Sequence, residues 1–329
     1  MYLRYITKKS NRKTAHSAAL HPIKKKSSMT KAERFEGCII GGAIGDAFGS
    51  GYENKVTQIE DTFYLLAKPE IKKSNWQITD DTQLTLATIE AMIEDKDIKP
   101  ETVANQFVKC YKQRKIRGIG ASTLKSLQEL SFGGHWSQAG RRGEYAAGNG
   151  AAMRIAPIAF KEEITNREIR DICKITHNND EAYVGAKSVI IAIREILNRN
   201  WYGESNLIEL IIDQIPDTRV RDRLIEIKDI KSLQEIGQIG NDGYVVNSVP
   251  LAIAAANKVK EIGIEEMYLQ LITIGGDTDT NCSIAGQITG ALLGRKEIPD
   301  NLVNKLKKLT EYNWIVKTIN KLIEKENWV

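Results

Sequence analysis

Apolar residues recur at helical spacing along most of this chain, and no stretch shows the apolar–polar alternation of a half-buried strand. The spacing predicts helices at about residues 35–50, 79–94, 100–113, 121–130, 151–160, 166–177, 180–199, 205–214, 218–228, 247–260, 264–274, 281–293 and 300–325. Residues 131–150 lack this spacing and are expected to form a loop. The pattern therefore predicts an all-α, compact, many-helix domain whose functional residues lie on loops between helices.

The first predicted helix carries a glycine every fourth residue, at Gly41, Gly45 and Gly49. Such glycines line one helix face and let a neighbouring backbone approach closely. Asp46 lies in the same apolar turn and needs a hydrogen-bonding partner if it is buried. We therefore interpret Asp46 as a helix-packing or supporting residue. No apolar run approaches the roughly 18–20 residues that a membrane span requires, so no membrane partner is expected.

The net charge of +5 over 329 residues is unevenly distributed. Residues 1–32 contain nine Lys or Arg and no Asp or Glu, whereas the rest of the chain carries 38 basic and 42 acidic residues. We expect a basic N-terminal arm at 1–32 and a mildly acidic domain at 33–329, which does not favour nucleic-acid binding by the domain. The four cysteines are scattered, with no zinc-ligand spacing, which is typical of a protein in a reducing cytoplasm.

Two carboxylate-rich segments each lead into an apolar helical run: Thr79-Asp80-Asp81-Thr82, and Gly275 to Thr280 with Asp277 and Asp279. Helix capping explains a single Asp or Thr in such a position. It does not explain two carboxylates side by side, because like charges repel unless a cation offsets them. Hard oxygen ligands favour Mg²⁺ or Mn²⁺. A hydrolytic centre with two metal ions is the first hypothesis.

Other site classes fit less well. An EF-hand loop that begins at Asp277 requires Gly and Glu where the chain has Cys282 and Ile288. A phosphatase that uses an aspartate nucleophile requires Thr where Asn281 stands, and remains a weak alternative. The chain has neither a P-loop nor a dinucleotide fingerprint after a strand, and no Gly-x-Ser-x-Gly elbow.

Two further segments are candidates for ligand binding. Gly148, Asn149 and Gly150 precede a predicted helix, where free amides can bind phosphate oxygens, although the same residues also make plain turns. His177 lies between two predicted helices, where capping or surface roles are more common than catalysis.

Together these segments resemble the ADP-ribosylglycohydrolase family, the group of the dinitrogenase reductase-activating glycohydrolase, from about Arg34 to Arg295. The motifs that carry the resemblance are GCIIGGAIGDAFGSGYE at 37–53, ITDDTQLTLAT at 78–88, GNGAAMRIAPIA at 148–159, THNNDEAYVGA at 176–186 and GGDTDTNCSIAGQITGALLG at 275–294. The resemblance implies an all-α fold with two Mg²⁺ or Mn²⁺ ions.

The resemblance also implies residue roles. Thr79, Asp80 and Asp81 would bind one ion, and Asp277, Asp279 and Thr280 the other, with Asp279 bridging. Glu53 would form an acidic gate near the metals. The amides around Gly148, Asn149 and Gly150 would hold ADP-ribose, with His177 near its phosphates or distal ribose.

The implied reaction is metal-dependent removal of ADP-ribose from a modified protein, with arginine as the preferred acceptor and serine or another acceptor as alternatives. Water would attack the anomeric carbon, and Asp277 or Asp81 would take its proton. A housekeeping or regulatory role is one alternative. A non-catalytic module that binds ADP-ribose is another, although binding alone does not require paired aspartates.

The resemblance leaves residues 1–32 unexplained. Met29 is one alternative start, and an organellar targeting peptide is a second reading of the upstream residues. Our hypothesis is that the arm binds an acidic partner, an ADP-ribosyltransferase toxin whose cleft it would block. The chain would then be a cytoplasmic immunity-type ADP-ribosylarginine hydrolase that both blocks the toxin and removes its modification.

Overall fold

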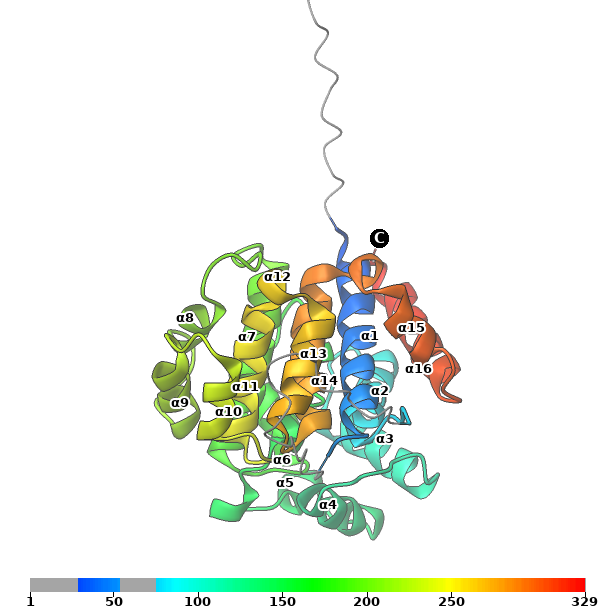
Figure 1. Cartoon of the computed structure of the whole chain (residues 1–329). Helices are drawn as coiled ribbons and strands as arrows, with labels where there is room; N and C mark the ends of the chain where they lie inside the picture. The colour runs from blue at the N-terminus through cyan, green and yellow to red at the C-terminus, as the bar shows by residue number, and fades with distance from the viewer. Residues whose placement is uncertain (1–28, 54–74, 329) are drawn as a thin grey trace, which may run out of the picture.

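The computed structural model describes residues 29–53 and 75–328, which fold into helices joined by short connections (Figure 1). The α-helices are α1 (Lys31–Gly49), α2 (Asp80–Glu94), α3 (Pro100–Lys112), α4 (Ala121–Ser131), α5 (Trp136–Ala139), α6 (Asn166–Lys174), α7 (Asp180–Leu197), α8 (Leu207–Ile212), α9 (Arg219–Ile227), α10 (Leu233–Ile239), α11 (Val245–Asn257), α12 (Val259–Ile262), α13 (Ile264–Ile274), α14 (Thr278–Leu293), α15 (Asp300–Leu306) and α16 (Tyr312–Glu326). The 3-10 helices are η1 (Glu144–Ala146), η2 (Asn149–Ala151), η3 (Ala156–Phe160) and η4 (Arg295–Glu297). The described residues contain no strand, so the all-α prediction is confirmed.

Several predicted helix boundaries are wrong. The segment 151–160 is not one helix but η2 and η3 with a turn between them. The segment 300–325 is divided into α15 and α16 by a turn in which Tyr312 N donates to Leu309 O. The short helices α5 and α10 were not predicted, because so few residues show no clear periodicity. The helix α14 begins at Thr278 rather than at residue 281, which puts Asp279 and Thr280 inside its first turn.

Glycines bring α1 and α14 into backbone contact at the centre of the molecule, where Figure 1 shows the two helices side by side. A Cβ atom on Gly41 would lie 2.3 Å from Gly286 O, and one on Gly45 would lie 2.1 Å from Cys282 O. At the end of α1, a Cβ on Gly49 would lie 2.3 Å from Thr278 O. The two helices are therefore antiparallel, and the C-terminal end of α1 meets the first turn of α14.

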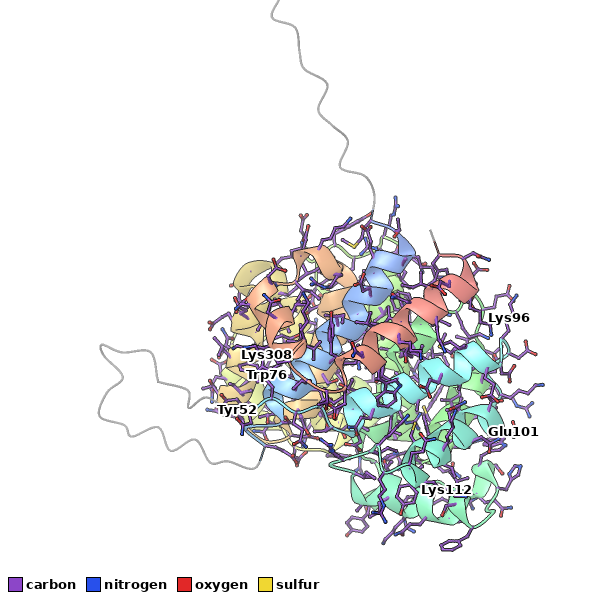
Figure 2. All side chains as sticks on the ribbon, turned by 90° about the vertical axis from the view of Figure 1, so that its right-hand side faces the viewer. Tyr52, Trp76, Lys96, Glu101, Lys112 and Lys308 are labelled. Carbon is purple, nitrogen blue, oxygen red and sulfur yellow. The ribbon has the colours of Figure 1, made fainter. Side chains whose placement is uncertain are left out.

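The two ends of α1 are fixed differently. At its start, Thr30 and Glu33 form a capping box. At its far end, the Phe48 ring lies 5.8 Å from both the Tyr52 and Trp76 rings, whose side chains Figure 2 shows close to this end of the helix. These contacts bring the chain that leaves α1 next to the chain that enters α2.

The start of α1 at Lys31 lies just inside the arm predicted at 1–32, of which residues 1–28 lie outside the described residues. None of the described helices is both long and apolar enough to cross a membrane.

Candidate functional site

Asp46 of α1 binds the first turn of α2. Its carboxylate accepts hydrogen bonds from Thr79 N at 3.0 and 3.1 Å and from Thr79 Oγ1 at 2.8 Å. It also accepts from the backbone N of Thr82 at 3.1 Å and from the Thr82 hydroxyl. The side chain is completely buried. A carboxylate from α1 thus satisfies free amides at the start of α2, which fixes the positions of the aspartates in that turn.

Three carboxylates meet where α1, α2 and α14 converge. Oxygen atoms of Asp46, Asp81 and Asp279 lie within 4.8 Å of one another, and we call these three residues the acidic cluster. The Asp81 Oδ2 atom accepts from Thr280 Oγ1 at 3.1 Å. Its Oδ1 atom is buried and has no hydrogen-bond partner among the described residues. The cluster therefore contains more negative charge and more acceptors than the neighbouring side chains satisfy.

Burial dominates the protonation equilibria of the cluster. It raises the pKa of Asp46 to about 6 and that of Asp279 to about 10, the latter with further contributions from Asp277. The pKa of Asp81 is raised well above its ordinary value by burial and then by the charge of Asp279. No Lys, Arg or His in the described part of the chain forms an ion pair with these carboxylates. Carboxylates so close together are stable as anions only when a cation lies between them.

Asp80 and Asp277 lie beside this cluster. Asp80 is buried, and burial followed by the charge of Asp46 raises its pKa well above the ordinary value. Asp277 is half-buried, and its Oδ2 atom accepts from Asn149 Nδ2 at 2.7 Å. Its backbone N donates to Asn241 O at 3.0 Å. Asp277 thus lies between the acidic cluster and the segment that contains Asn149.

Two glycines make the turn that leads to Asp277. Gly275 and Gly276 have φ values of 81° and 77°, a left-handed conformation that other residues rarely adopt. A Cβ on Gly276 would lie 2.4 Å from Asn241 O. The two glycines therefore allow the sharp turn that starts α14.

Residues Gly148, Asn149 and Gly150, here called the 148–150 loop, lie against His177. Asn149 N donates to Gly243 O at 3.1 Å, which holds the loop to the segment before α11. A Cβ on Gly150 would lie 2.6 Å from Cε1 of His177, and one on Gly148 would lie 3.1 Å from its Nε2. His177 is only 3% exposed, so it lies behind the loop rather than on the surface.

The structure thus brings together most residues that the sequence singled out. Thr79 and Thr280 donate to the cluster, and Asn149 joins the 148–150 loop to Asp277. Glu53 is exposed just beyond α1, and its charge contributes to the raised pKa of Asp279. Asp46, which we interpret from the sequence as a packing or supporting residue, supports the start of α2 and also belongs to the acidic cluster. The signal for this placement in the sequence is an acidic residue, Asp46, within a Gly-rich apolar turn.

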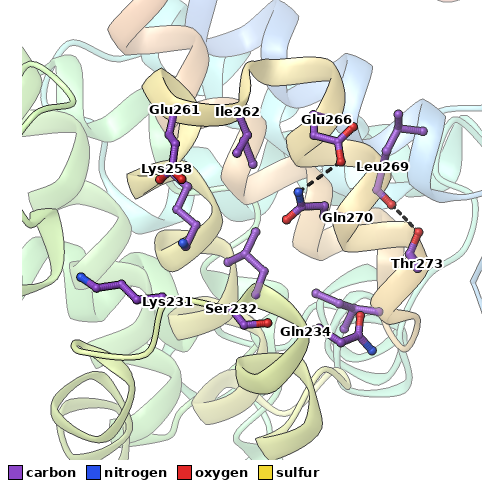
Figure 3. A pocket seen from close by; sticks show the side chains of 12 residues that line it. Lys231, Ser232, Gln234, Lys258, Glu261, Ile262, Glu266, Leu269, Gln270 and Thr273 are labelled. Carbon is purple, nitrogen blue, oxygen red and sulfur yellow. Dashed lines mark hydrogen bonds between the residues drawn. The ribbon is translucent and has the colours of Figure 1, made fainter. Parts of the chain in front are cut away.

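A separate cavity lies away from this site. It has a volume of about 510 Å³ and is lined by residues of α10, α12 and α13, with Lys231, Lys258, Glu261 and Glu266 around it (Figure 3). Its charges are mixed, and it contains none of the predicted site residues. The arrangement of carboxylates, and not the size of a cavity, therefore defines the candidate site.

The donor atoms of the cluster fit a hard divalent cation. They are carboxylate and hydroxyl oxygens, with no Cys or His in the group, which favours Mg²⁺ or Mn²⁺ over Zn²⁺. The unpartnered Asp81 Oδ1 atom is an additional ligand available to such an ion. Two tightly packed helices and one further helix end hold these atoms, as a preorganised metal site requires.

Comparison with known proteins identifies the family of this chain. The family model for ADP-ribosylglycohydrolase matches residues 27–328, and the chain belongs to the ADP-ribosylglycohydrolase family. The family is metal-dependent, which the acidic cluster fits. The resemblance seen in the sequence is therefore confirmed.

Particular relatives are similar over most of their length. A Gallus gallus protein named ADP-ribosylhydrolase ARH3 is 24% identical, over 88% of this chain and 93% of that protein. A Pseudomonas putida protein named ADP-ribosylarginine hydrolase Tri1 is 26% identical, over 83% of this chain and 74% of that protein. A solved structure titled ADP-ribosylglycohydrolase-related protein complex shares the fold with a TM-score of 0.60, at 23% identity over 89% of this chain and 98% of that one.

Proposed function

We propose that this chain removes ADP-ribose from modified protein side chains, preferentially arginine, with divalent cations held at the acidic cluster. The observation that carries the proposal is the buried group of Asp46, Asp81 and Asp279, with an unpartnered oxygen and no cationic partner among the described residues. Family membership supports glycoside hydrolysis, and the name of the Pseudomonas putida relative supports arginine as the acceptor.

The proposed ligands form two sets on facing helix ends. Thr79, Asp80 and Asp81 at the start of α2 would hold one Mg²⁺ or Mn²⁺ ion. Asp277, Asp279 and Thr280 at the start of α14 would hold the second, with Asp279 shared between the ions. Asp46 would position the first set through its hydrogen bonds to Thr79 and Thr82.

When bound, the cations would orient the ribose hydroxyls, polarise the bond at the anomeric carbon and lower the pKa of water. The bond between that carbon and the arginine nitrogen breaks, and a water oxygen forms the new bond. Asp277 is our preferred acceptor of the water proton, because it is half-buried and Asn149 orients its carboxylate. Asp81 is the second candidate. The departing nitrogen takes up a proton, which leaves free ADP-ribose and unmodified arginine.

The ligand would lie across the 148–150 loop. The amides of Gly148 and Gly150 would hold ADP-ribose, with His177 directly behind them, whereas the Asn149 amide already donates to Gly243 O. Glu53, exposed beyond α1, would lie at the entrance to the metal site as an acidic gate.

The test compares two substrates that differ only in linkage. The same protein carries ADP-ribose on arginine in one substrate and on serine in the other, and free ADP-ribose is measured with Mg²⁺ and after chelation. We expect Mg²⁺-dependent release from arginine, none after chelation, and full activity in Asp97→Asn, which changes an exposed carboxylate beyond α2. Release from serine alone would contradict the choice of acceptor. Release that survives chelation would contradict the metal-dependent mechanism.

A second proposal concerns the basic arm. Residues 1–32 carry nine positive charges and no negative ones, which suits an acidic partner such as the cleft of an ADP-ribosyltransferase toxin. Replacing Lys24, Lys25 and Lys26 with Gln in the full chain should weaken toxin binding and leave hydrolysis unchanged. If the variant binds the toxin as tightly as the native chain, the arm does not block the toxin, and housekeeping de-ADP-ribosylation becomes the preferred role.

A further inference from the structure

A fully buried arginine lies behind the 148–150 loop. The Nη2 atom of Arg154 donates to Thr176 Oγ1 at 2.8 Å and to Ile172 O at 3.3 Å, and its guanidinium lies 4.6 Å from the centre of the Phe107 ring. Its Nε and Nη1 atoms have no hydrogen-bond partner among the described residues, and no described carboxylate forms an ion pair with it. Burial lowers the pKa of Arg154 to about 10, so it is charged at neutral pH. A buried charge with so few partners is costly.

The Thr176 hydroxyl joins this charge to His177. Its oxygen accepts from Arg154, which has only donors, and lies 2.9 Å from Nδ1 of His177. A hydroxyl has one hydrogen to donate. Arg154 has no acceptor, and no other described residue accepts from this hydroxyl, so its hydrogen is satisfied only if it points to Nδ1. Arg154 thus determines the direction in which Thr176 donates.

His177 then has a defined protonation state. Burial and the charge of Arg154 lower its pKa to about 3, so the ring is neutral at physiological pH. Cys173, the other titratable group that influences Arg154, has a pKa raised to about 12 by burial and is an uncharged thiol. A neutral imidazole whose Nδ1 accepts a hydrogen bond carries its proton on Nε2.

The Nε2 atom faces the 148–150 loop and makes no hydrogen bond to any described residue. A Cβ atom on residue 148 would lie 3.1 Å from Nε2 and would cover this edge of the imidazole. Glycine at this position leaves the edge uncovered. The Nε2–H group is therefore a donor at the loop without a partner in the described part of the chain.

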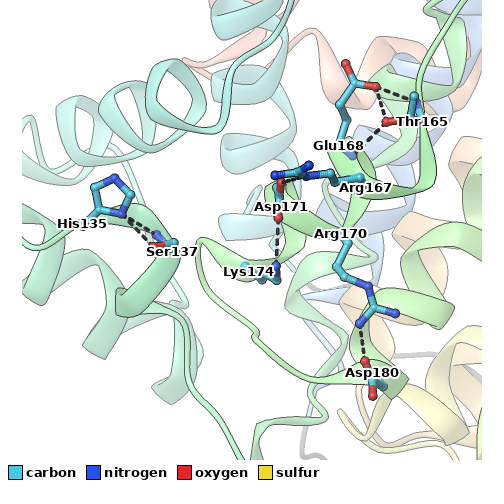
Figure 4. Close-up of polar contacts among 9 residues, drawn as sticks. All are labelled: His135, Ser137, Thr165, Arg167, Glu168, Arg170, Asp171, Lys174 and Asp180. Carbon is cyan, nitrogen blue, oxygen red and sulfur yellow. Dashed lines mark hydrogen bonds and ion pairs between the residues drawn. The ribbon is translucent and has the colours of Figure 1, made fainter.

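The turn that carries Thr176 and His177 is held on several sides. Arg141 N donates to Thr176 O at 3.0 Å, and Ser126 Oγ donates to the same oxygen at 3.3 Å. Before the turn, α6 begins with a capping box of Thr165 and Glu168, and an ion pair from Arg170 to Asp180 joins α6 to α7 (Figure 4). These contacts do not involve the Thr176 hydroxyl, so they hold the backbone when that hydroxyl is removed.

We propose that Arg154 and Thr176 are positioning residues that fix His177 as a neutral donor, with its proton on Nε2, for an oxygen of bound ADP-ribose. The inference about the ligand rests on the proposed function, whereas the fixed tautomer does not. The arrangement makes His177 a pH-independent binding residue and not a general base.

The first test is ¹⁵N NMR of the imidazoles in the full chain, with the His177 signal assigned by His177→Gln. We expect the Nε2–H tautomer and no titration from about pH 5.5 to 8. Thr176→Val, which keeps the volume but removes the hydroxyl, should give a mixture of tautomers, and Thr176→Ser should restore the single one. An Nδ1–H tautomer in the native chain, or an unchanged spectrum in Thr176→Val, would overturn the proposal.

The second test is calorimetric titration of the same proteins with free ADP-ribose. Loss of one oriented hydrogen bond to a charged ligand should weaken binding about tenfold in Thr176→Val, with recovery in Thr176→Ser. Arg154→Met should show the same tautomer mixture and affinity loss, whereas Arg167→Met on the exposed face of α6 should show neither. Equal affinity in all variants would overturn the ligand role. A native chain that does not bind ADP-ribose would refute the proposed function, while the spectrum would still decide the tautomer.

Discussion

The acidic cluster and the group of Arg154, Thr176 and His177 are two buried polar regions next to the 148–150 loop, which the first reaches through Asp277 and the second contacts through His177. The first has several carboxylates and no positive charge from the described residues. The second has one cation, one hydroxyl and an imidazole whose pKa is lowered to about 3, so that it stays neutral. The charge of the first region must change when a ligand arrives, whereas that of the second is already set.

This difference shows how one site combines two requirements. A metal site must attract a cation, so it keeps negative charge that destabilises the empty protein. A ligand-positioning site must keep one geometry, so its protons are fixed by neighbouring donors and acceptors. The two regions should therefore respond differently to substitution, to pH and to added metal.

The largest effect is expected from Asp81→Asn. Loss of a metal ligand should reduce ADP-ribose release by at least about 100-fold, because changes even beyond the ligands commonly cost 10–100-fold. The metal-stripped variant should nevertheless melt at a higher temperature than the native chain, because one of the repelling carboxylates is gone. Activity assays and calorimetric melting measure both effects. A lower melting temperature would show that repulsion does not dominate the cluster.

Gly45→Ala should disturb the cluster through the backbone. The added Cβ would lie 2.1 Å from Cys282 O, so α1 and α14 must separate. We expect a loss of about 1–3 kcal/mol in the free energy of unfolding and weaker Mg²⁺ binding. The His177 tautomer should be unchanged, because that region does not depend on the contact between α1 and α14. Gly120→Ala is the control, since no atom lies within 4 Å of its added Cβ. Equal stability of both variants would contradict the role of the close packing.

The melting temperature of the metal-stripped protein should fall as pH rises from about 7 to 8.5. The folded-state pKa of Asp279 is raised to about 10, above the ordinary value of 3.8, so the folded chain holds a proton that the unfolded chain has lost. Stability is therefore greatest at low pH and declines toward the folded-state pKa. The lowered pKa of His177 makes stability rise with pH, but only below about pH 6.5, the ordinary pKa of the group. His177 therefore does not affect the range from about pH 7 to 8.5.

We expect a decrease of a few degrees over this range, and saturating Mg²⁺ should remove most of it. Differential scanning calorimetry at several pH values, with and without the ion, provides the measurement. If Mg²⁺ leaves the pH dependence of the melting temperature unchanged, that dependence comes from groups outside the cluster.

The smallest effect is expected from Glu53→Gln. Glu53 is exposed, and its charge is a lesser contribution to the raised pKa of Asp279. The substitution should raise the Mg²⁺ concentration for half-maximal activity about two- to threefold, because one of several charges that attract the ion is lost. A loss of activity that excess Mg²⁺ does not restore would instead place Glu53 in direct contact with the substrate.

The sequence predicted the fold class, and it singled out most of the residues that the structure brings together, because both depend on local patterns. Helical spacing of apolar residues is a local signal, and paired aspartates before a helix indicate a cation wherever the helices are placed. Gly41 and Gly45 similarly indicated a close helix contact, which α14 makes. Metal binding itself stays a prediction.

The remaining features depend on contacts between distant segments. Asp46 joins the cluster because α1 lies against the start of α2. Thr79, which donates to Asp46 there, is 33 residues further along the chain. Arg154 is followed by apolar residues that suggest burial, but Thr176, which gives it a role, lies 22 residues away. The turn that divides α15 from α16 lies in a Lys- and Leu-rich segment whose spacing continues to look helical. Such pairings require the folded chain.

The most direct test of a metal centre at the acidic cluster is calorimetric titration of the full, metal-stripped chain with Mn²⁺ at about pH 7.5, with Asp81→Asn and Asp97→Asn alongside. We expect two ions bound per native chain, proton release on binding from carboxylates whose pKa burial has raised, and loss of at least one ion in Asp81→Asn only. Absence of Mn²⁺ binding by the native chain, or equal binding by Asp81→Asn, would contradict a metal centre at the acidic cluster.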